Sequence, residues 1–237
     1  MMASRQRQSG ISLLVVIVIT LLTLLMAVWA ARTALFNERI VGNDADYQRT
    51  FEAAQAMLQD AELDILGQTA DGRVCQVEGS DGKVCRLTTS VWFVDEEKDF
   101  VGLLNTLEAQ PDVPCIQGIC AKRTGKQDFW NDRKTLEQMR RPGVGARYGE
   151  FTGARKGNYG HPLLQTTAAH TGAWYWVEVM PYASGESGLI TNRPGAAKLD
   201  LHLNPALVYR ITAIAQGLKP GTRVVLQSTL ARHKRQD

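Results

Sequence analysis

The sequence of 237 residues lacks a marked excess of charge of either sign. Its formal net charge is only +3, and the charged residues are spread along the chain. Proteins that bind nucleic acid usually concentrate basic residues on one face or in one stretch. The composition therefore gives no reason to place the protein in that class.

Motifs that carry catalysis are also missing from the sequence. It contains no H-E-x-x-H metal motif, no nucleophile elbow around a serine and no C-x-x-C pair. The glycines of 143–149 match neither the G-x-G-x-x-G pattern nor the P-loop. We therefore expect no enzyme activity, no bound metal and no cofactor. A periplasmic enzyme on a membrane stalk, with a site assembled from distant residues, stays as an alternative.

What the sequence does contain is one long apolar run, Ile11 to Ala31, without charge, glycine or proline. As a helix it spans roughly 31 Å, about the hydrocarbon thickness of a bilayer. Arg5 and Arg7 precede the run and no acid does. The positive-inside rule then places the N-terminus in the cytoplasm and the remaining chain beyond the inner membrane. The alternative is a cleaved secretory signal, for which Val28 and Ala30 offer a small-residue cleavage site.

Helical periodicity continues past this run to about Leu66. Apolar positions separated by threes and fours define one helix face. They are Ile40, Tyr47, Phe51, Ala54, Leu58, Ala61 and Ile65, whereas the charged residues assigned to other faces are Asp46, Arg49, Glu52, Asp60 and Asp64. We expect a transmembrane helix at 11–31, its amphipathic continuation at 32–66 and a globular domain at 67–237 that packs on the apolar face.

The C-terminal part of the globular domain is the clearest β region. Segments 174–180, 207–214 and 223–230 are rich in β-branched and aromatic residues. They predict an antiparallel sheet with one face on the helix, and Gly217 to Gly221 predicts the hairpin loop between the last two strands. Tyr175, between two tryptophans, is interpreted as part of the core. The predicted fold class is α+β.

The rest of the globular domain gives weaker signals. Short strands are expected at 90–94 and at Leu199 to Leu203, and two more on either side of a turn, at Val74, Val77 and Val84. Residues 67–172 show little helical periodicity, and 121–172 are interpreted as a long surface excursion.

Four cysteines lie on the exported side of the apolar run: Cys75, Cys85, Cys115 and Cys120. An even number in an oxidising compartment favours disulfides over free thiols. Of the three possible pairings, the simplest joins Cys75 to Cys85 and Cys115 to Cys120, and the other two stay open.

Three alternating acids, Asp95, Glu97 and Asp99, form a weak candidate for a calcium site, because carboxylate oxygens suit that ion. They lack the glycine and the distal glutamate of an EF-hand loop, and Lys98 stands among them. A solvated turn is the favoured interpretation.

The basic tail is a weak candidate for contact with DNA phosphates through Arg232, Lys234 and Arg235. A polar chain end that aids solubility is the favoured interpretation.

The start of the chain resembles a prepilin leader. A short basic segment ends in Gly10 at the edge of the apolar run. In prepilins a dedicated peptidase cuts after this glycine, so 1–10 would be the leader, and Gly10 and Ile11 would flank the processing site. Ile11 is a less common first mature residue than Phe.

The run TALFNERIVGN at 33–43 resembles the conserved block of PilX-type minor pilins. The element is S/T-x-L-x-x-E-R-x-x-G-N, and it is matched place by place at Thr33, Glu38, Arg39, Gly42 and Asn43. The following F-E-A-A run departs from the family at Gln55, where glutamate is usual. The loop from Cys115 to Cys120 is similar to the family's Cys-x-x-Gly-x-Cys element.

This resemblance implies a type IV pilin-like fold, in which a long N-terminal helix packs on a C-terminal antiparallel sheet. It implies a minor pilin that helps to start pilus assembly and sits at or near the tip, with roles in adhesion and twitching motility. The expected partners are other minor pilins, the major pilin, the prepilin peptidase and the inner membrane. The alternatives are a tip pseudopilin of type II secretion and a pilus-borne adhesin or DNA-binding module.

Val15 occupies the place at which major pilins carry a glutamate inside the membrane run. A carboxylate in lipid is costly and is kept only where it acts. In pilins it is understood to pair with the N-terminal amine of a neighbouring subunit. Its absence here is what we expect of a subunit at the fibre tip, where no subunit lies above.

Overall fold

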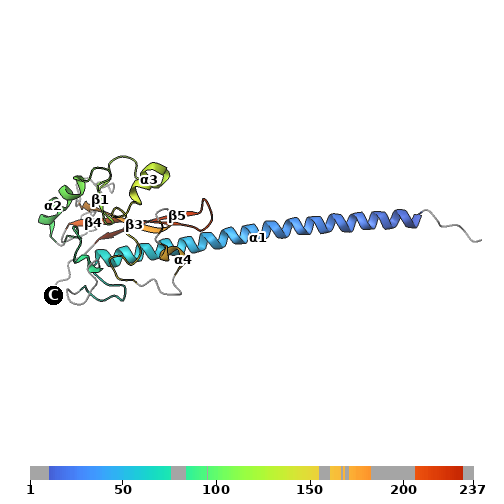
Figure 1. Ribbon diagram of the computed structural model, residues 1–237, viewed down its shortest axis with the longest axis horizontal. Coiled ribbons are helices and arrows are strands. Elements are labelled where there is room, and N and C mark those ends of the chain that lie inside the picture. The colour runs from blue at the N-terminus through green and yellow to red at the C-terminus, as the bar shows by residue number, and fades with distance from the viewer. Residues whose placement is uncertain are drawn as a thin grey trace, which may run out of the picture. The chain divides into compact units, whose positions relative to one another are not determined.

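The computed structural model describes residues 11–75, 84–94, 96–154, 161–166, 168, 171–182 and 206–231. It divides into two compact units, Met1–Ala45 and Asp46–Asp237, and each is described by itself. One helix, α1 (Ile11–Ile65), supplies the described part of the first unit and continues into the second (Figure 1).

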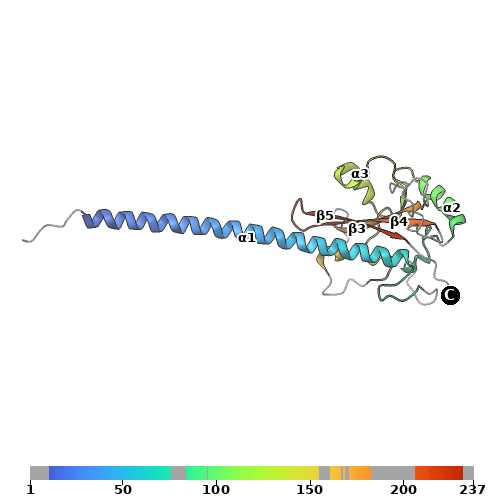
Figure 2. The same cartoon turned by 180° about the vertical axis from the view of Figure 1, so that it is seen from behind.

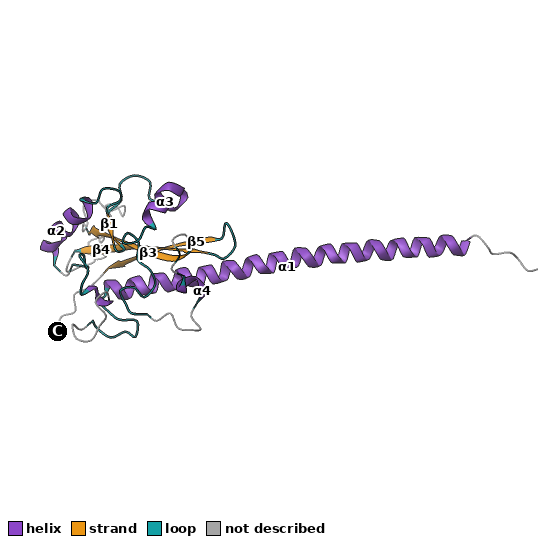
Figure 3. Ribbon diagram, viewed as in Figure 1, coloured by secondary structure: helices purple, strands orange, loops and turns teal. Residues whose placement is uncertain are grey.

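The other elements belong to the second unit, which we call the body. Its helical elements in chain order are η1 (Val84–Arg86), α2 (Glu97–Glu108), η2 (Phe129–Asn131), α3 (Arg133–Met139) and α4 (Pro162–Gln165). Its strands are β1 (Cys115–Ile116), β2 (Ile119–Ala121), β3 (Gly172–Pro181), β4 (Leu207–Gln216) and β5 (Arg223–Ala231) (Figure 3).

The helix α1 ends in a glycine motif. Gly67 takes the left-handed conformation with a φ of 63°. Its N–H donates to the carbonyl of Asp64 at 3.1 Å, and the N–H of Gln68 donates to the carbonyl of Leu63 at 2.9 Å. These two bonds are the Schellman pattern, in which a residue without a β-carbon lets the chain reverse over the last turn. The sequence thus stops the helix within the glycine-containing stretch after Leu66.

The five strands form one sheet in the order β1-β2-β3-β4-β5. The antiparallel arrangement expected for the three long C-terminal strands is confirmed, because β3 pairs with β4 and β4 pairs with β5 antiparallel. The sheet extends beyond the prediction, since β2 pairs with β3 in parallel and β1 pairs with β2 antiparallel.

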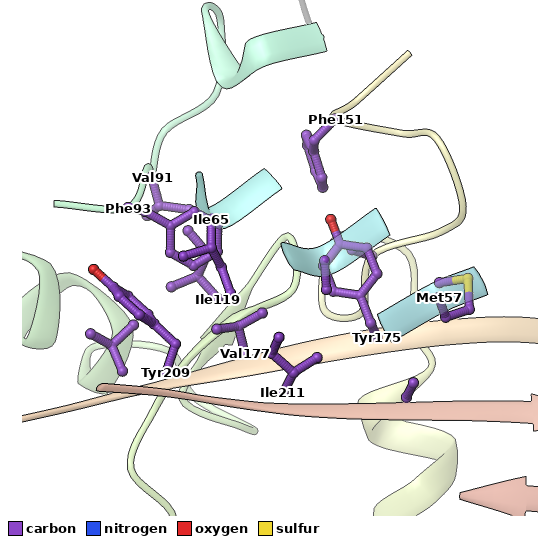
Figure 4. Packing of buried hydrophobic residues seen from close by; sticks show 14 of the residues in the cluster. Met57, Ile65, Val91, Phe93, Ile119, Phe151, Tyr175, Val177, Tyr209 and Ile211 are labelled. Atoms are coloured by element: carbon purple, nitrogen blue, oxygen red, sulfur yellow. The ribbon is translucent and has the colours of Figure 1, made fainter. Parts of the chain in front are cut away.

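Both faces of the sheet are covered (Figures 1 and 2). On one face, Tyr175, Val177 and Ile211 share a core with the α1 residues Met57 and Ile65 (Figure 4). A second core includes Trp174, Trp176 and Ile214 from the sheet together with Phe129, Leu136 and Met139 from η2 and α3. Successive strand residues point to opposite faces, so β3 supplies large side chains to both cores. This explains why it is apolar almost throughout.

The strand predicted at 90–94 is wrong. Among the residues that the structure describes, 91–94 have no strand partner, although Val91, Phe93 and Val94 are buried. The Phe93 ring packs edge-on against Tyr209, with ring centroids 5.7 Å apart. The alternating pattern thus reflects contact with the core and not pairing in a sheet. Trp92 is exposed between its buried neighbours.

The surface excursion predicted for 121–172 is also wrong. Phe129, Leu136, Met139 and Phe151 are buried. Residues 67–172 are also more helical than expected, since they contain α2 and α3. Their helical periodicity is weak in the sequence, because both helices are short and present only a few buried positions.

The pair of strands expected around the first cysteines is not present as predicted. Val74 forms only an isolated bridge with Gln68, and Val84 begins the short 3-10 helix η1. Val77 and the strand expected at Leu199 to Leu203 lie outside the described residues.

Candidate assembly interface

The apolar part of α1 is the first component of the site. Its side chains are exposed from Ile11 to Ala31. The most apolar 18-residue stretch of α1 has a mean hydropathy of 3.0. By length and composition, α1 could therefore cross a membrane. The hydroxyls of Thr20 and Thr23 donate to the carbonyls of Ile17 and Thr20, both at 2.9 Å. The polar atoms of these threonines are thereby satisfied within the helix, as an apolar environment requires.

The residues predicted for processing and fibre packing lie on or just before this helix. Gly10 is outside the described residues, and Ile11 begins α1. Val15 is exposed. The matched block follows in the same helix, with Glu38, Arg39 and Asn43 exposed and Gly42 partly buried.

The second component is the face of α1 that packs in the body, and here the predicted distribution of charge is wrong. Ile40 and Tyr47, assigned to the packed face, are exposed, whereas Asp46, Asp60 and Asp64 are buried. The buried residues of α1 are Asp46, Thr50, Ala53, Ala54, Met57, Asp60, Ala61, Asp64 and Ile65, which follow one helix face. Three carboxylates therefore lie in the contact between helix and body.

Asp46 binds the tip of the β4–β5 hairpin. Its carboxylate accepts the N–H groups of Leu218 at 3.0 Å and of Lys219 at 3.2 Å. Burial opposes the charged form of Asp46, but hydrogen bonds from Thr222 and from these two amides outweigh it and lower the pKa of the carboxyl. A charged Asp46 thus holds the hairpin against α1.

Asp60 binds the loop that follows α3. It accepts the N–H of Gly149 at 2.8 Å and the hydroxyl of Thr152. Burial raises the pKa of Asp60 to about 6; these two hydrogen bonds act in the opposite direction, and the negative charges of Asp64 and Glu150 add to the increase. This carboxyl therefore titrates near pH 6.

Asp64 forms a buried ion pair with Arg86. The Arg86 Nε donates to Oδ1 at 2.8 Å and Nη2 donates to Oδ2 at 2.6 Å, and the two side chains are only 4% and 2% exposed. The hydroxyl of Tyr175 in β3 also donates to Oδ2, at 2.6 Å. Burial alone would lower the pKa of Arg86, but the Asp64 carboxylate raises it above its ordinary value. Burial, together with Asp64, raises the pKa of Tyr175 well above its ordinary value.

A disulfide lies directly beside this ion pair. Cys75 and Cys85 are bonded, with Cα atoms 5.6 Å apart, and Cys115 is bonded to Cys120 across the β1–β2 turn. Cys85 and Arg86 both take left-handed backbone conformations, with φ of 62° and 54°. Such conformations are unfavourable for residues with side chains, so the covalent bond and the ion pair together fix an otherwise strained segment.

Little of the other predicted sites falls within the described residues. Asp99 is exposed on α2, while Asp95 and the side chain of Glu97 lie outside the described residues. The basic tail residues Arg232, Lys234 and Arg235 lie outside them as well. Among the residues that the structure describes, no group of three or more His, Cys, Asp or Glu side chains could hold a metal ion.

Comparison with known proteins covers both α1 and the sheet. Residues 9–59 match the family model described as PilX N-terminal, and residues 116–232 match the model described as type IV pilus assembly protein PilX C-term. No curated protein and no solved structure matches the chain. The matched ranges include the apolar helix, Asp46 and all five strands apart from the first residue of β1. The chain therefore belongs to the PilX family of type IV pilus assembly proteins.

Proposed function

We propose that this protein is a minor pilin that helps to initiate type IV pilus assembly and sits at or near the pilus tip. It acts through contacts between subunits and has no catalytic activity. One observation carries the proposal, namely that an apolar segment without a carboxylate at Val15 runs without a break into the helix that binds the body. The family is a structural pilin family that is not known to be enzymatic, which supports the same proposal.

The proposed topology follows from the order of these segments. Residues 1–10 are a leader that the prepilin peptidase removes after Gly10. Residues 11–31 cross the inner membrane, 32–66 continue the helix, and 67–237 form the exported domain. During assembly the same apolar helix moves from lipid into the fibre, where it packs against the helices of other minor pilins and the major pilin.

Because residue 15 carries no carboxylate, the subunit can form the amine contact on one side only. A subunit with valine at position 15 cannot pair with the N-terminal amine of a subunit above it. Its own amine at Ile11 stays available to a subunit below. Such a subunit fits the first position of a fibre, and it avoids the cost of an unpaired charge in an apolar environment.

The test compares strains that express the wild-type chain, no chain, or the chain with Val15→Glu. We expect the deletion to abolish or strongly reduce the number of fibres, and immunogold labelling of the wild-type body to appear at fibre ends. Val15→Glu should move labelling along the fibre, because the subunit can then accept another above it. Val16→Glu is the matched control, since it places the same charge one position away and should not restore that contact.

Labelling along the length of wild-type fibres would contradict the tip position. Intact fibres in the deletion strain, with lost attachment or DNA uptake, would favour the pilus-borne adhesin or DNA-binding module. The leader is tested by the mass of the mature chain, which should begin at Ile11 with a methylated amine. Replacement of Gly10 by valine should leave the leader uncleaved, and an unchanged mature mass in that variant would contradict processing after Gly10.

A further inference from the structure

Arginine side chains gather around Trp174, on the face of the sheet that α3 covers (Figure 1). The central guanidinium carbons of Arg147 and Arg140 lie 4.0 and 4.6 Å from the centroid of the indole ring. Such stacking on an aromatic face stabilises a positive charge away from bulk water. Trp174 is only 1% exposed, whereas both arginines are partly exposed. The guanidinium groups, and not the ring, therefore meet the solvent here.

A third arginine, Arg223, joins this group at the last pair of the β4–β5 ladder. The register pairs Arg223 with Gln216, and Gln216 with Gly172, two residues before Trp174. Because directly paired residues project from the same face of a sheet, Arg223 lies on the face that carries Trp174. The side-chain oxygen of Gln216 also accepts a hydrogen bond from Nη2 of Arg140, at 3.3 Å. Arg140 and Arg223 thus meet at Gln216.

Two of these side chains keep hydrogen-bond donors that a dissolved ligand can reach. Arg223 is exposed and makes no side-chain hydrogen bond among the described residues. The Nε of Arg140 is buried and cannot take part, but its Nη1 is not buried and has no acceptor in the described part of the chain. Nη1 of Arg140 and the guanidinium of Arg223 are therefore the available donors.

Arg147 is held by the chain on its other side. Its Nη1 and Nη2 donate to the carbonyls of Thr171 and Ala168, at 3.0 and 2.7 Å. A β-carbon at Gly172 would lie 2.9 Å from Nη1, so the absence of a side chain there makes room for the guanidinium. Arg147 therefore contributes a fixed positive charge to the group.

The positive charges of this group outweigh the acids near it. Within the described ranges, none of the three arginines forms an ion pair. Glu137 acts on Arg140 but is already in an ion pair with another arginine, and Glu150 accepts the backbone N–H of Arg147 at 3.1 Å. Burial, followed by the charges of Arg223 and Arg147, lowers the pKa of Arg140 to about 10, against the effect of Glu137. A bound anion would relieve this repulsion.

The undescribed segments nearest to the group contain no acid that could be this anion. Residues 155–160, 167 and 169–170 adjoin the described residues around Arg147 and include neither Asp nor Glu. Residues 183–205 do contain acids, but they join the opposite ends of β3 and β4, beyond the pair of Pro181 and Leu207.

The chemistry of the group indicates which anion fits. Guanidinium groups match the oxygens of a phosphate, to which they donate two parallel hydrogen bonds. Three positive charges favour a dianion over a monoanion, because attraction grows with the product of the charges. The arginines cover Trp174, so no base or sugar ring stacks on it, and recognition rests on the charged group alone.

We propose that Arg140, Arg147 and Arg223 bind a dianionic phosphate group, either inorganic phosphate or the phosphate monoester of a larger molecule. Arg223 and Nη1 of Arg140 donate hydrogen bonds to the phosphate oxygens, and Arg147 adds its charge. This inference goes beyond the proposed minor-pilin role and does not depend on it.

The site is tested on the purified full-length chain in detergent micelles, labelled with ¹⁵N, at pH 8 and constant ionic strength set by chloride. We expect inorganic phosphate to shift the indole N–H signal of Trp174 in a saturable way, because the groups that cover the ring bind the ion. Dimethyl phosphate, a diester with a single charge, should need a roughly tenfold higher concentration. Methyl phosphate, a dianionic monoester, is titrated in parallel.

Variants then locate the binding. Arg223→Gln should weaken phosphate binding about tenfold, the value of one hydrogen bond to a charged group, and Arg140→Gln by at least as much. Arg141→Gln is the matched control, since it removes the same charge next to Arg140 from an exposed side chain that pairs with Asp112. The indole N–H of Trp176, which donates to the carbonyl of Met139, reports whether each variant is folded. Because Arg223 is exposed, its variant keeps the test valid if Arg140→Gln does not fold.

The proposal is overturned if phosphate causes no saturable shift at Trp174 or if dimethyl phosphate binds as tightly as inorganic phosphate. It is also overturned if Arg141→Gln weakens binding as much as Arg223→Gln. Methyl phosphate that binds like inorganic phosphate supports a monoester on a larger molecule, and binding of inorganic phosphate alone supports the free ion. No fibre is involved in the titration, so its failure is distinguishable from failure of the proposed minor-pilin role.

Discussion

Gly217 leaves the space that Asp46 fills. A β-carbon at position 217 would lie 2.6 Å from the Asp46 Oδ2 and 2.6 Å from the β-carbon of Thr222. The absence of a side chain here lets the β4–β5 hairpin tip approach α1 closely enough for Asp46 to accept two backbone N–H groups.

Gly217→Ala should therefore weaken the contact between hairpin and helix. We expect the free energy of unfolding to fall by about 1 to 3 kcal/mol, as for other overpacked sites. Thermal melting of the full chain in micelles measures this. Gly102→Ala is the control, because a β-carbon there meets no atom within 4 Å and lies inside α2. It should leave stability unchanged or raise it by up to about 1 kcal/mol, and an equal loss in both variants would contradict the close approach.

Asp60 should make the body less stable as the pH rises from about 4 to about 6. Its pKa is raised from 3.8 to about 6 in the folded chain, so the folded state binds more protons than the unfolded state within this window. Stability therefore falls as pH rises through the window, and the whole loss is present above pH 6. For a shift of this size it is on the order of 3 kcal/mol.

The free energy of unfolding of the wild-type chain and of Asp60→Asn is measured at pH 4.5 and at pH 7.5. The wild-type chain should lose stability between these two values, and the variant should lose much less, because the amide does not titrate. The opposite shift of Asp46 acts mainly below its ordinary value of 3.8, outside this range. The same pH dependence in both proteins would show that Asp60 does not titrate near pH 6.

The pair of Asp64 and Arg86 should be costly to break from either side. Asp64→Leu or Arg86→Leu alone leaves a buried charge without its partner, and each should lower stability by about 3 to 5 kcal/mol. The double variant should lose much less than the sum. Arg133→Ala is the control for an exposed pair, because Arg133 and Glu137 have side chains that are 93% and 50% exposed, and it should change stability by less than about 0.5 kcal/mol. Additive losses would argue against a coupled buried pair.

The Cys75–Cys85 disulfide should stabilise the body in part by holding Arg86. Replacing both cysteines by alanine should cost about 3 kcal/mol from the loss of a closed loop alone. In the background of Asp64→Leu with Arg86→Leu, the same replacement should cost less, because no ion pair then depends on the position of residue 86. Melting temperatures of the four proteins measure this coupling, and an equal cost in both backgrounds would contradict it.

The sequence predicts this architecture where one signal dominates. The charge-free run up to Ala31 and the β-branched segments after Trp174 indicate the helix and the long strands, since each keeps one kind of composition over many residues. Residues 91–94 show the limit of this reasoning. Alternating burial also occurs in a segment that packs on a core without a strand partner, and no local pattern distinguishes the two cases.

The buried carboxylates could not be predicted from helix periodicity. The sequence predicts Asp46, Asp60 and Asp64 outside the packed face of the helix, because acids are rarely buried without partners. Their partners are the amides of Leu218 and Gly149 and the side chain of Arg86, all brought in by tertiary structure. The spacing of 46, 60 and 64 is a usable signal of their burial. It places the three acids on the same helix face as the small residues Ala53 and Ala61.

The three carboxylates also fix the register of α1 in the body. Asp60 and Asp64 are four residues apart, so a slip of about 6 Å in one direction would bring Asp60 opposite Arg86 and preserve a charged pair there. The same slip would bring Gly42 to the hairpin tip, and the reverse slip would bring Thr50, so neither offers a carboxylate to the amides of Leu218 and Lys219. Asp46 is thus the residue that distinguishes the native alignment from its nearest competitors. A force along the helix axis would therefore be resisted at all three acids at once.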